Sequence, residues 1–94
     1  MDSLATTPLA EVIEARLASA LSPERLVVSN DSAQHRGHMG DDGSGESHFS
    51  VTIEAAAFAG KSRVERQRMV NAALADLLAQ RIHALAIKAV APGE

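Results

Sequence analysis

The first apolar pattern along the chain predicts a helix. Over residues 9–21 the apolar side chains recur at every third or fourth position, which places one apolar stripe along a helix. Thr7 and Pro8 precede this stripe, and a hydroxyl cap followed by proline is typical of a helix start. We expect Ser22-Pro23 to end the helix.

Two later segments have the composition and period of strands. Residues 26–28 form a short β-prone run, and residues 48–54 alternate strictly between apolar and polar side chains. We expect residues 26–30 and 48–54 to pair antiparallel. Residues 31–47 between them hold four of the six glycines and almost no apolar side chain, which predicts a long loop that is functional or mobile.

The next segment carries the signals of a second helix. Residues 56–60 are typical of a turn, with a short extra helix as an alternative. Ser62 and Glu65 then have the spacing of a capping box. A single apolar stripe over residues 70–78 predicts one helix. Three charged residues on this helix are expected to face solvent: Arg63, Arg66 and Asp76.

The last segment predicts a third strand. Residues 82–90 are apolar on both faces and have β-branched residues near both ends, and Pro92-Gly93 follows them. The expected fold is therefore α+β, in the order α-β-β-α-(α)-β, with a three-stranded sheet and helices on one face. We expect residues 1–94 to form one small domain, with residues 1–7 as a flexible N-terminal segment.

Composition excludes several classes of protein. Apolar residues make up 46% of the chain and charged residues 22%, as in ordinary globular domains. The chain has no Cys, which excludes disulfide scaffolds, thiolate nucleophiles and a self-sufficient Cys-ligated iron–sulfur site. No apolar run is long enough to span a bilayer, and the first residues lack the features of a secretory signal. We therefore expect a soluble, cytoplasmic protein without membrane contact.

The charge is distributed unevenly. The net charge is −3, yet residues 61–94 carry six basic and three acidic side chains. An acidic chain with only two aromatic residues disfavours nonspecific nucleic-acid binding. A local basic cluster could still contact phosphate or an acidic partner, with a solvated helix face as the simpler interpretation. This cluster consists of Lys61, Arg63, Arg66 and Arg68.

The four histidines are the candidates for metal binding, because neutral imidazole is a common ligand of zinc, copper and iron. His35 and His38 lie three residues apart in the glycine-rich loop, where a solvated polar loop is the simpler interpretation. By alternation His48 lies opposite the face of Phe49 and is expected at the surface. His83 is either a hydrogen-bonded core histidine or a ligand whose other ring nitrogen is held by an acceptor.

No pattern of residues assembles a catalyst. The chain has no nucleophile elbow, no Walker loop and no paired carboxylates on a recognisable framework. We therefore expect a binding protein, not an enzyme. A zinc or copper site built from His35, His38 and Asp41 is one alternative for the loop.

Several short motifs, in their order and spacing, resemble the BolA family over roughly residues 9–92. The motifs that carry the resemblance are Leu21-Ser22-Pro23, Asp31-Ser32-Ala33-Gln34-His35-Arg36-Gly37-His38, Glu46-Ser47-His48-Phe49, Phe58-Ala59-Gly60-Lys61-Ser62, Arg66-Gln67-Arg68-Met69-Val70, Leu74-Ala75-Asp76-Leu77 and His83-Ala84-Leu85-Ala86-Ile87.

The resemblance implies an α-β-β-α-α-β domain similar to the class II KH fold. It also implies iron–sulfur cluster assembly or trafficking, or iron and redox regulation, in a heterodimer with a monothiol glutaredoxin. In that family a [2Fe-2S] cluster is shared: the glutaredoxin and its glutathione supply thiolates. The BolA-like protein supplies one loop ligand, here His35 with His38 as the alternative, and the histidine before the last strand, here His83. The isolated chain is expected to hold no cofactor and to be a monomer or a weak homodimer.

Two positions depart from the family pattern. Ala33 stands where many relatives have a histidine, which leaves His35 or His38 as the loop ligand, and Gln67 replaces a histidine between two arginines. The competing function is a nucleic-acid-binding transcriptional regulator that uses the Lys61–Arg68 cluster, because KH-like folds bind nucleic acid. The usual GxxG clamp between helices is missing there, and Gly37-His38-Met39-Gly40 lies in the long loop instead.

Overall fold

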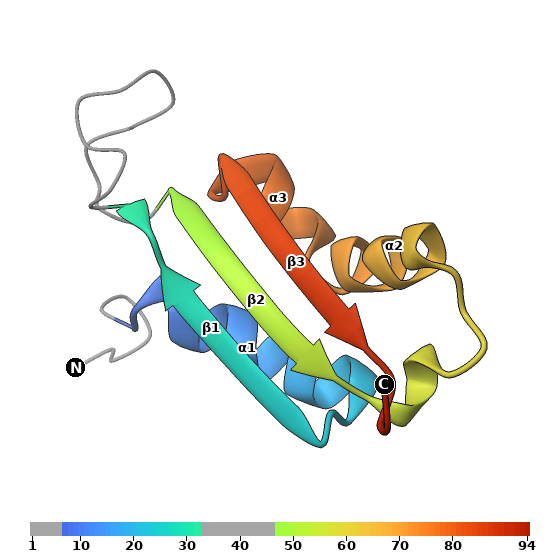
Figure 1. The fold of residues 1–94 in the computed structure, drawn as a ribbon. Coiled ribbons are helices and arrows are strands. Elements are labelled where there is room, and N and C mark those ends of the chain that lie inside the picture. Colours follow the sequence, from blue (N-terminus) through green and yellow to red (C-terminus); the bar gives the residue numbers. More distant parts are fainter. Residues whose placement is uncertain (1–6, 33–46) are drawn as a thin grey trace.

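The computed structural model describes residues 7–32 and 47–94. The expected α+β architecture is confirmed: one three-stranded sheet carries the helices on a single face (Figure 1). The elements in chain order are α1 (Leu9–Leu21), β1 (Arg25–Asn30), β2 (His48–Glu54), the 3₁₀ turn η3 (Ala56–Phe58), α2 (Arg63–Ala73), α3 (Ala75–Gln80) and β3 (Ala84–Val90). The predicted loop ligands His35 and His38, together with Ala33 and Asp41, lie outside the described residues.

The strands lie in the order β1-β2-β3. β1 pairs antiparallel with β2, as predicted, with Val28 opposite Val51. β2 and β3 are parallel, with His48 opposite Ala84. A parallel pair needs a crossover, which η3, α2 and α3 supply. The parallel register brings the first residues of β2 and β3 to the same end of the sheet.

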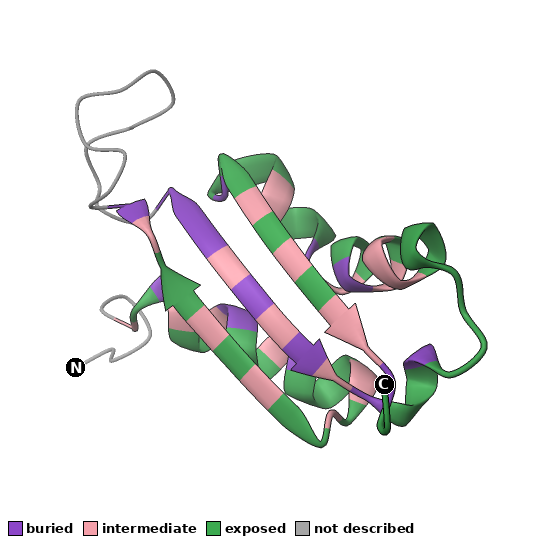
Figure 2. Cartoon of the chain, in the orientation of Figure 1, coloured by how far each residue is buried: buried purple, intermediate pink, exposed green. Residues whose placement is uncertain are grey.

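The hydrophobic core lies between the sheet and the helices. Burial is concentrated on β2, the central strand, where Phe49, Val51 and Ile53 are almost inaccessible to solvent (Figure 2). Ile13 and Leu17 from α1 contribute to the same cluster. On the opposite face of the sheet, the described residues leave the strands open. None of the helices in the described residues is both long and apolar enough to cross a membrane.

The ends of α1 follow the sequence signals with one difference. The N-cap is Pro8 and not Thr7, and it makes no side-chain cap bond. Instead, the carbonyl of Pro8 accepts hydrogen bonds from the N–H groups of Glu11 and Val12. At the other end Ser22 adopts a left-handed conformation with φ of 47°, and its N–H bonds to the carbonyl of Ala18. The predicted C-terminal stop is therefore confirmed.

The capping box of the second helix is formed as predicted. The hydroxyl of Ser62 accepts from the N–H of Glu65 at 3.1 Å, and the carboxylate of Glu65 accepts from the N–H of Ser62 at 2.8 Å. Because the two residues are only three positions apart, the capping box can be predicted from the local sequence alone.

The single helix predicted from the apolar stripe is divided into α2 and α3. Leu74, with φ of −114°, lies between them, and its N–H bonds to Asn71 instead of a residue four positions back. Val70, Leu74 and Leu77 are all buried, so the bend keeps both helices packed on the sheet. The predicted strand at 82–90 begins two residues later, because the N–H of Ile82 bonds to the carbonyl of Leu77 and closes α3.

Candidate functional site

Two histidine rings lie side by side at one end of the sheet. His48 begins β2 and His83 directly precedes β3, and their ring centroids are 5.3 Å apart. The backbone holds this pair together: the N–H groups of His83 and Ala84 both donate to the carbonyl of Ser47, at 2.8 and 3.2 Å. The arrangement follows from the parallel register of β2 and β3.

The burial of the two histidines differs from the sequence-based expectation. His48 was expected at the surface, and this prediction is wrong, because the residue is only 7% exposed. The alternation of apolar and polar residues correctly placed His48 on the face opposite Phe49. The alternation does not show which other residues pack against the end of a strand and bury it. His83, in contrast, is exposed and is not a core histidine. Its exposed ring is therefore accessible to a partner molecule.

A network of serine hydroxyls fixes the position of His48. The Ser47 hydroxyl lies 2.9 Å from Nδ1 of His48, with the donor set by the tautomer of the ring. The hydroxyl of Ser32 accepts from the N–H groups of Ser47 and His48, at 2.8 and 3.1 Å. Ser32 and Ser47 are both buried. The network therefore ties the end of β1 to the start of β2 beside the histidine pair.

Asp31 lies on the same end of the sheet. Its carboxylate accepts hydrogen bonds from the hydroxyls of Ser29 and Ser50, one on each oxygen. Its N–H donates to the carbonyl of His48 at 2.8 Å. Asp31, His48 and Ala84 are among the residues that line a hollow of about 350 Å³ next to this network.

The histidine pair alone does not complete a metal site. Within residues 7–32 and 47–94, no group of three or more His, Cys, Asp or Glu side chains could hold a metal ion. The chain also contains no Cys. His48 and His83 could supply imidazole nitrogens to a metal centre, but further ligands would have to come from elsewhere.

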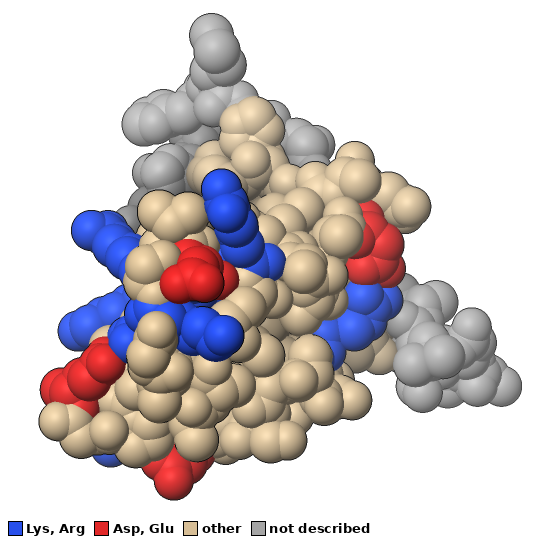
Figure 3. All heavy atoms as spheres, turned by 90° about the vertical axis from the view of Figure 1, so that its right-hand side faces the viewer, with Lys and Arg blue, Asp and Glu red and all other residues tan. Residues whose placement is uncertain are grey.

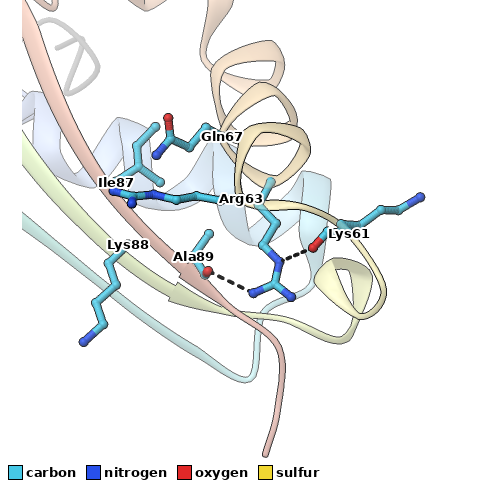
Figure 4. Close-up of a pocket in the computed structure, with 7 residues that line it drawn as sticks. Lys61, Arg63, Gln67, Ile87, Lys88 and Ala89 are labelled. Carbon is cyan, nitrogen blue, oxygen red and sulfur yellow. Dashed lines mark hydrogen bonds between the residues drawn. The ribbon is translucent and has the colours of Figure 1, made fainter. Parts of the chain in front are cut away.

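A second candidate site is a basic groove between α2 and β3, with a volume of about 500 Å³ (Figure 4). Figure 3 shows that Lys and Arg side chains gather on this side of the molecule, with acidic side chains among them. In Figure 4, Lys61 and Lys88 point away from the groove, whereas Arg63 and Gln67 lie near Ile87. The groove is lined by Lys61, Arg63, Arg66, Gln67, Ile87, Lys88 and Ala89.

Arg66 does not face solvent as expected, because its side chain is only 13% exposed. Nη1 and Nη2 donate to the two carboxylate oxygens of Glu94, at 2.6 and 2.7 Å. Nε donates to the carbonyl of Lys61 and Nη1 to that of Ala89. The hydrogen bonds from Arg66 lower the pKa of Glu94 to about 2, with help from the N–H of Ala91, and the same pair raises the pKa of Arg66. The other members of the predicted basic cluster, Lys61, Arg63 and Arg68, are exposed.

Comparison with known proteins shows which family the chain resembles in sequence. A family model described as "BolA-like protein" matches residues 17–94. A Sinorhizobium sp protein named "Uncharacterized protein in cobS 5'region" is 53% identical over 87 residues, which cover 92% of this chain and 94% of that protein. A Vibrio cholerae protein named "DNA-binding transcriptional regulator BolA" is 48% identical, and the match covers 82% of this chain and 69% of the relative.

A solved structure has the same fold over nearly the whole chain. It is the BolA domain of SufE1 from Arabidopsis thaliana, which is 37% identical with a TM-score of 0.81. The match covers 92% of this chain and 94% of that domain. In sequence, the chain matches only 23% of the whole Arabidopsis protein, named "SufE-like protein 1, chloroplastic/mitochondrial". It spans 64% of BolA-like protein 1 from Mus musculus.

Proposed function

The chain belongs to the BolA family, and on this premise we propose that it binds a [2Fe-2S] cluster jointly with a monothiol glutaredoxin. The chain supplies His83 and one loop histidine, His35 or His38, and the glutaredoxin and its glutathione supply thiolates. It works as a binding partner in iron–sulfur cluster assembly or trafficking, or in iron and redox regulation, and it catalyses no reaction itself.

The exposed ring of His83 beside the buried ring of His48 is the observation that carries this proposal. An imidazole that coordinates an iron held by a second protein must be accessible and must keep a fixed orientation. The N–H of His83 is fixed to Ser47, and the ring of His48 lies against that of His83. β1 also ends and β2 begins at this end of the sheet, and His35 and His38 lie between the two strands in sequence.

The absence of Cys determines what a partner must contribute. A [2Fe-2S] cluster needs four ligands, and this chain offers no thiolate. A thiol-bearing partner therefore has to supply the sulfur ligands. Neutral imidazole in place of thiolate leaves the cluster less negatively charged, which raises its reduction potential and makes the ligation sensitive to pH.

The test is to co-express the chain with a monothiol glutaredoxin and purify the pair anaerobically with glutathione. We expect a coloured heterodimer whose visible and circular dichroism spectra differ from those of glutaredoxin alone. His83→Ala should return the spectrum to that of the glutaredoxin control. Failure of the two proteins to associate, with or without cluster, would reject the proposal.

The loop ligand needs its own comparison. His35→Ala and His38→Ala are prepared separately in the same heterodimer, and the variant that alters the spectrum identifies the ligand. His48→Ala is the third variant, because the ring of His48 contacts that of His83. If both loop variants leave the spectrum unchanged, the loop assignment is wrong, and a change in His48→Ala would then show that His48 affects the cluster directly or through His83.

Nucleic-acid binding is the second candidate function, and the name of the Vibrio cholerae relative favours it. Lys61, Arg63 and Arg68 are exposed and could contact phosphates. Both phenylalanines are buried, so neither offers a surface for base stacking. Genuine DNA binding predicts an affinity that falls steeply between about 50 and 200 mM salt. Undetectable or salt-independent binding would reject this function.

A further inference from the structure

A carboxylate of the chain itself pairs with Arg66, one of the residues that line the basic groove. Both oxygens of Glu94 accept from the guanidinium of Arg66, at 2.6 and 2.7 Å. This two-pronged pairing is the geometry by which arginine recognises planar anions. The guanidinium is also held from behind, by the carbonyls of Lys61 and Ala89. Arg66 is thus oriented for a carboxylate by contacts that do not involve Glu94.

The groove has a second cationic side chain besides Arg66, that of Arg63, which lies near Ile87. Of the described residues that line the groove, four are cationic and none is acidic, but Lys61 and Lys88 point away from it. Ile87 and Ala89 add an apolar strip along β3. The groove therefore suits a ligand that combines negative charge with some apolar surface.

Glu94 can leave Arg66 without disturbing the core. Its side chain is 46% exposed, whereas that of Arg66 is 13% exposed. Ala91 is buried, but Pro92, Gly93 and Glu94 are all exposed and form a turn. Apart from Arg66, Glu94 forms hydrogen bonds within the described residues only with the backbone of Ala91. Displacement of Glu94 would therefore change only this turn.

We propose that the groove between α2 and β3 binds an acidic segment of a partner protein, whose carboxylate replaces Glu94 on Arg66. Glu94 is then an intramolecular competitor that lowers the affinity for this segment. Peptide is favoured over nucleic acid because the occupant seen is a carboxylate and the chain carries a net charge of −3. A groove of about 500 Å³ also has room for only a few side chains.

This site is separate from the histidine pair. Ala84 begins β3 beside the histidines, whereas Ile87, Lys88 and Ala89 line the groove further along the same strand. The groove proposal therefore does not depend on the cluster-binding function. His83→Ala should leave peptide binding unchanged, so that failure of either proposal can be recognised independently.

The test uses fluorescein-labelled hexaglutamate as the probe, with binding measured by fluorescence polarisation at low salt. Glu94→Gln removes the charge but keeps an amide oxygen that can accept from the N–H of Ala91. We expect this variant to bind the peptide about threefold tighter or more, because the competing occupant is lost. Glu14→Gln, on the exposed side of α1, is the control with the same change in net charge.

Two further readouts locate the binding. Arg63→Ala, introduced into the Glu94→Gln background, should weaken peptide binding. The Nε–Hε resonance of Arg66 should shift on titration of the peptide. Equal affinities for the Glu94→Gln and Glu14→Gln variants, or no peptide binding at all, would overturn the proposal. A greater gain for a short DNA duplex than for the peptide would overturn it in favour of a nucleic-acid site.

Discussion

At the scale of single residues, the buried hydroxyl of Ser32 organises the end of the sheet that carries the histidine pair. Its hydroxyl accepts from two backbone N–H groups, those of Ser47 and His48, and the residue is only 3% exposed. Buried N–H groups without a partner are costly, so this hydroxyl helps to hold together the two chain segments that flank residues 33–46. The position of His48, and through it the contact with His83, depends on this serine.

Ser32→Ala should therefore destabilise the protein by about 2 kcal/mol, because two buried donors lose their acceptor. Urea unfolding followed by circular dichroism measures the change. Ser29→Ala is the matched control, since Ser29 is exposed and its hydroxyl donates only to Asp31. The control should lose about 0.5 kcal/mol or less. Equal losses for the two variants would contradict the role assigned to Ser32.

Single residues also show which features of the site the sequence alone could not predict. His83 could be singled out because it lies near the start of the strand predicted over residues 82–90 and belongs to a family motif. The burial of His48 could not, because it depends on the parallel pairing of β2 with β3, two segments separated by the whole crossover. The pairing of Arg66 with Glu94 was equally inaccessible, since the two residues are 28 positions apart and α2 alone does not indicate which strand it packs against.

At the scale of elements, local signals were the most informative. The capping box lies within four residues, and the structure forms it as the sequence predicts. The left-handed Ser22 followed by Pro23 ends α1 for an equally local reason. The break at Leu74 has no such signal, because the apolar stripe continues through it. There the packing of α2 and α3 on the sheet overrides the regular helical pattern.

The capping box gives a prediction for α2. Ser62→Ala removes the acceptor for the N–H of Glu65 and should cost about 1 kcal/mol of stability. Ser62→Gly should cost only a few tenths of a kcal/mol, because glycine is itself accepted at the N-cap. Thermal or urea unfolding of the two variants gives the comparison. A smaller loss for alanine than for glycine would mean that the cap does not limit the stability of α2.

At the scale of the whole molecule, two ion pairs connect distant parts of the chain. Arg16 on α1 donates two hydrogen bonds to Asp76 on α3, and Arg66 on α2 does the same to Glu94. The hydrogen bonds from Arg16 lower the pKa of Asp76 to about 2, from an ordinary value of 3.8. The corresponding pair lowers the pKa of Glu94 from 4.5 to about 2. Both carboxylates therefore bind protons more readily in the unfolded chain than in the folded one.

This difference sets the direction of the pH dependence. A carboxylate whose pKa is lower in the folded state contributes its full stability above its unfolded pKa and loses it as the pH falls towards the folded value. For Asp76 and Glu94 the loss begins near pH 4.5 and continues to about pH 2. The stabilisation that these two pairs contribute should accordingly be steady between about pH 7 and pH 5 and fall below that range, which lowers the melting temperature in acid.

The double variant Asp76→Asn/Glu94→Gln tests whether these two pairs produce the acid sensitivity. It should melt at a lower temperature than the unmodified protein at neutral pH, and the difference should shrink as the pH falls towards 2, because protonation has already weakened both pairs. Added salt should reduce the difference at neutral pH, since both pairs are partly exposed.

Glu14→Gln/Glu24→Gln removes the same charge from other exposed sites and is the control. If the control variant loses as much of the fall in melting temperature at low pH as the paired variant does, net charge, and not the two ion pairs, governs the acid response. Glu94 would then be held on Arg66 too weakly to compete with a partner.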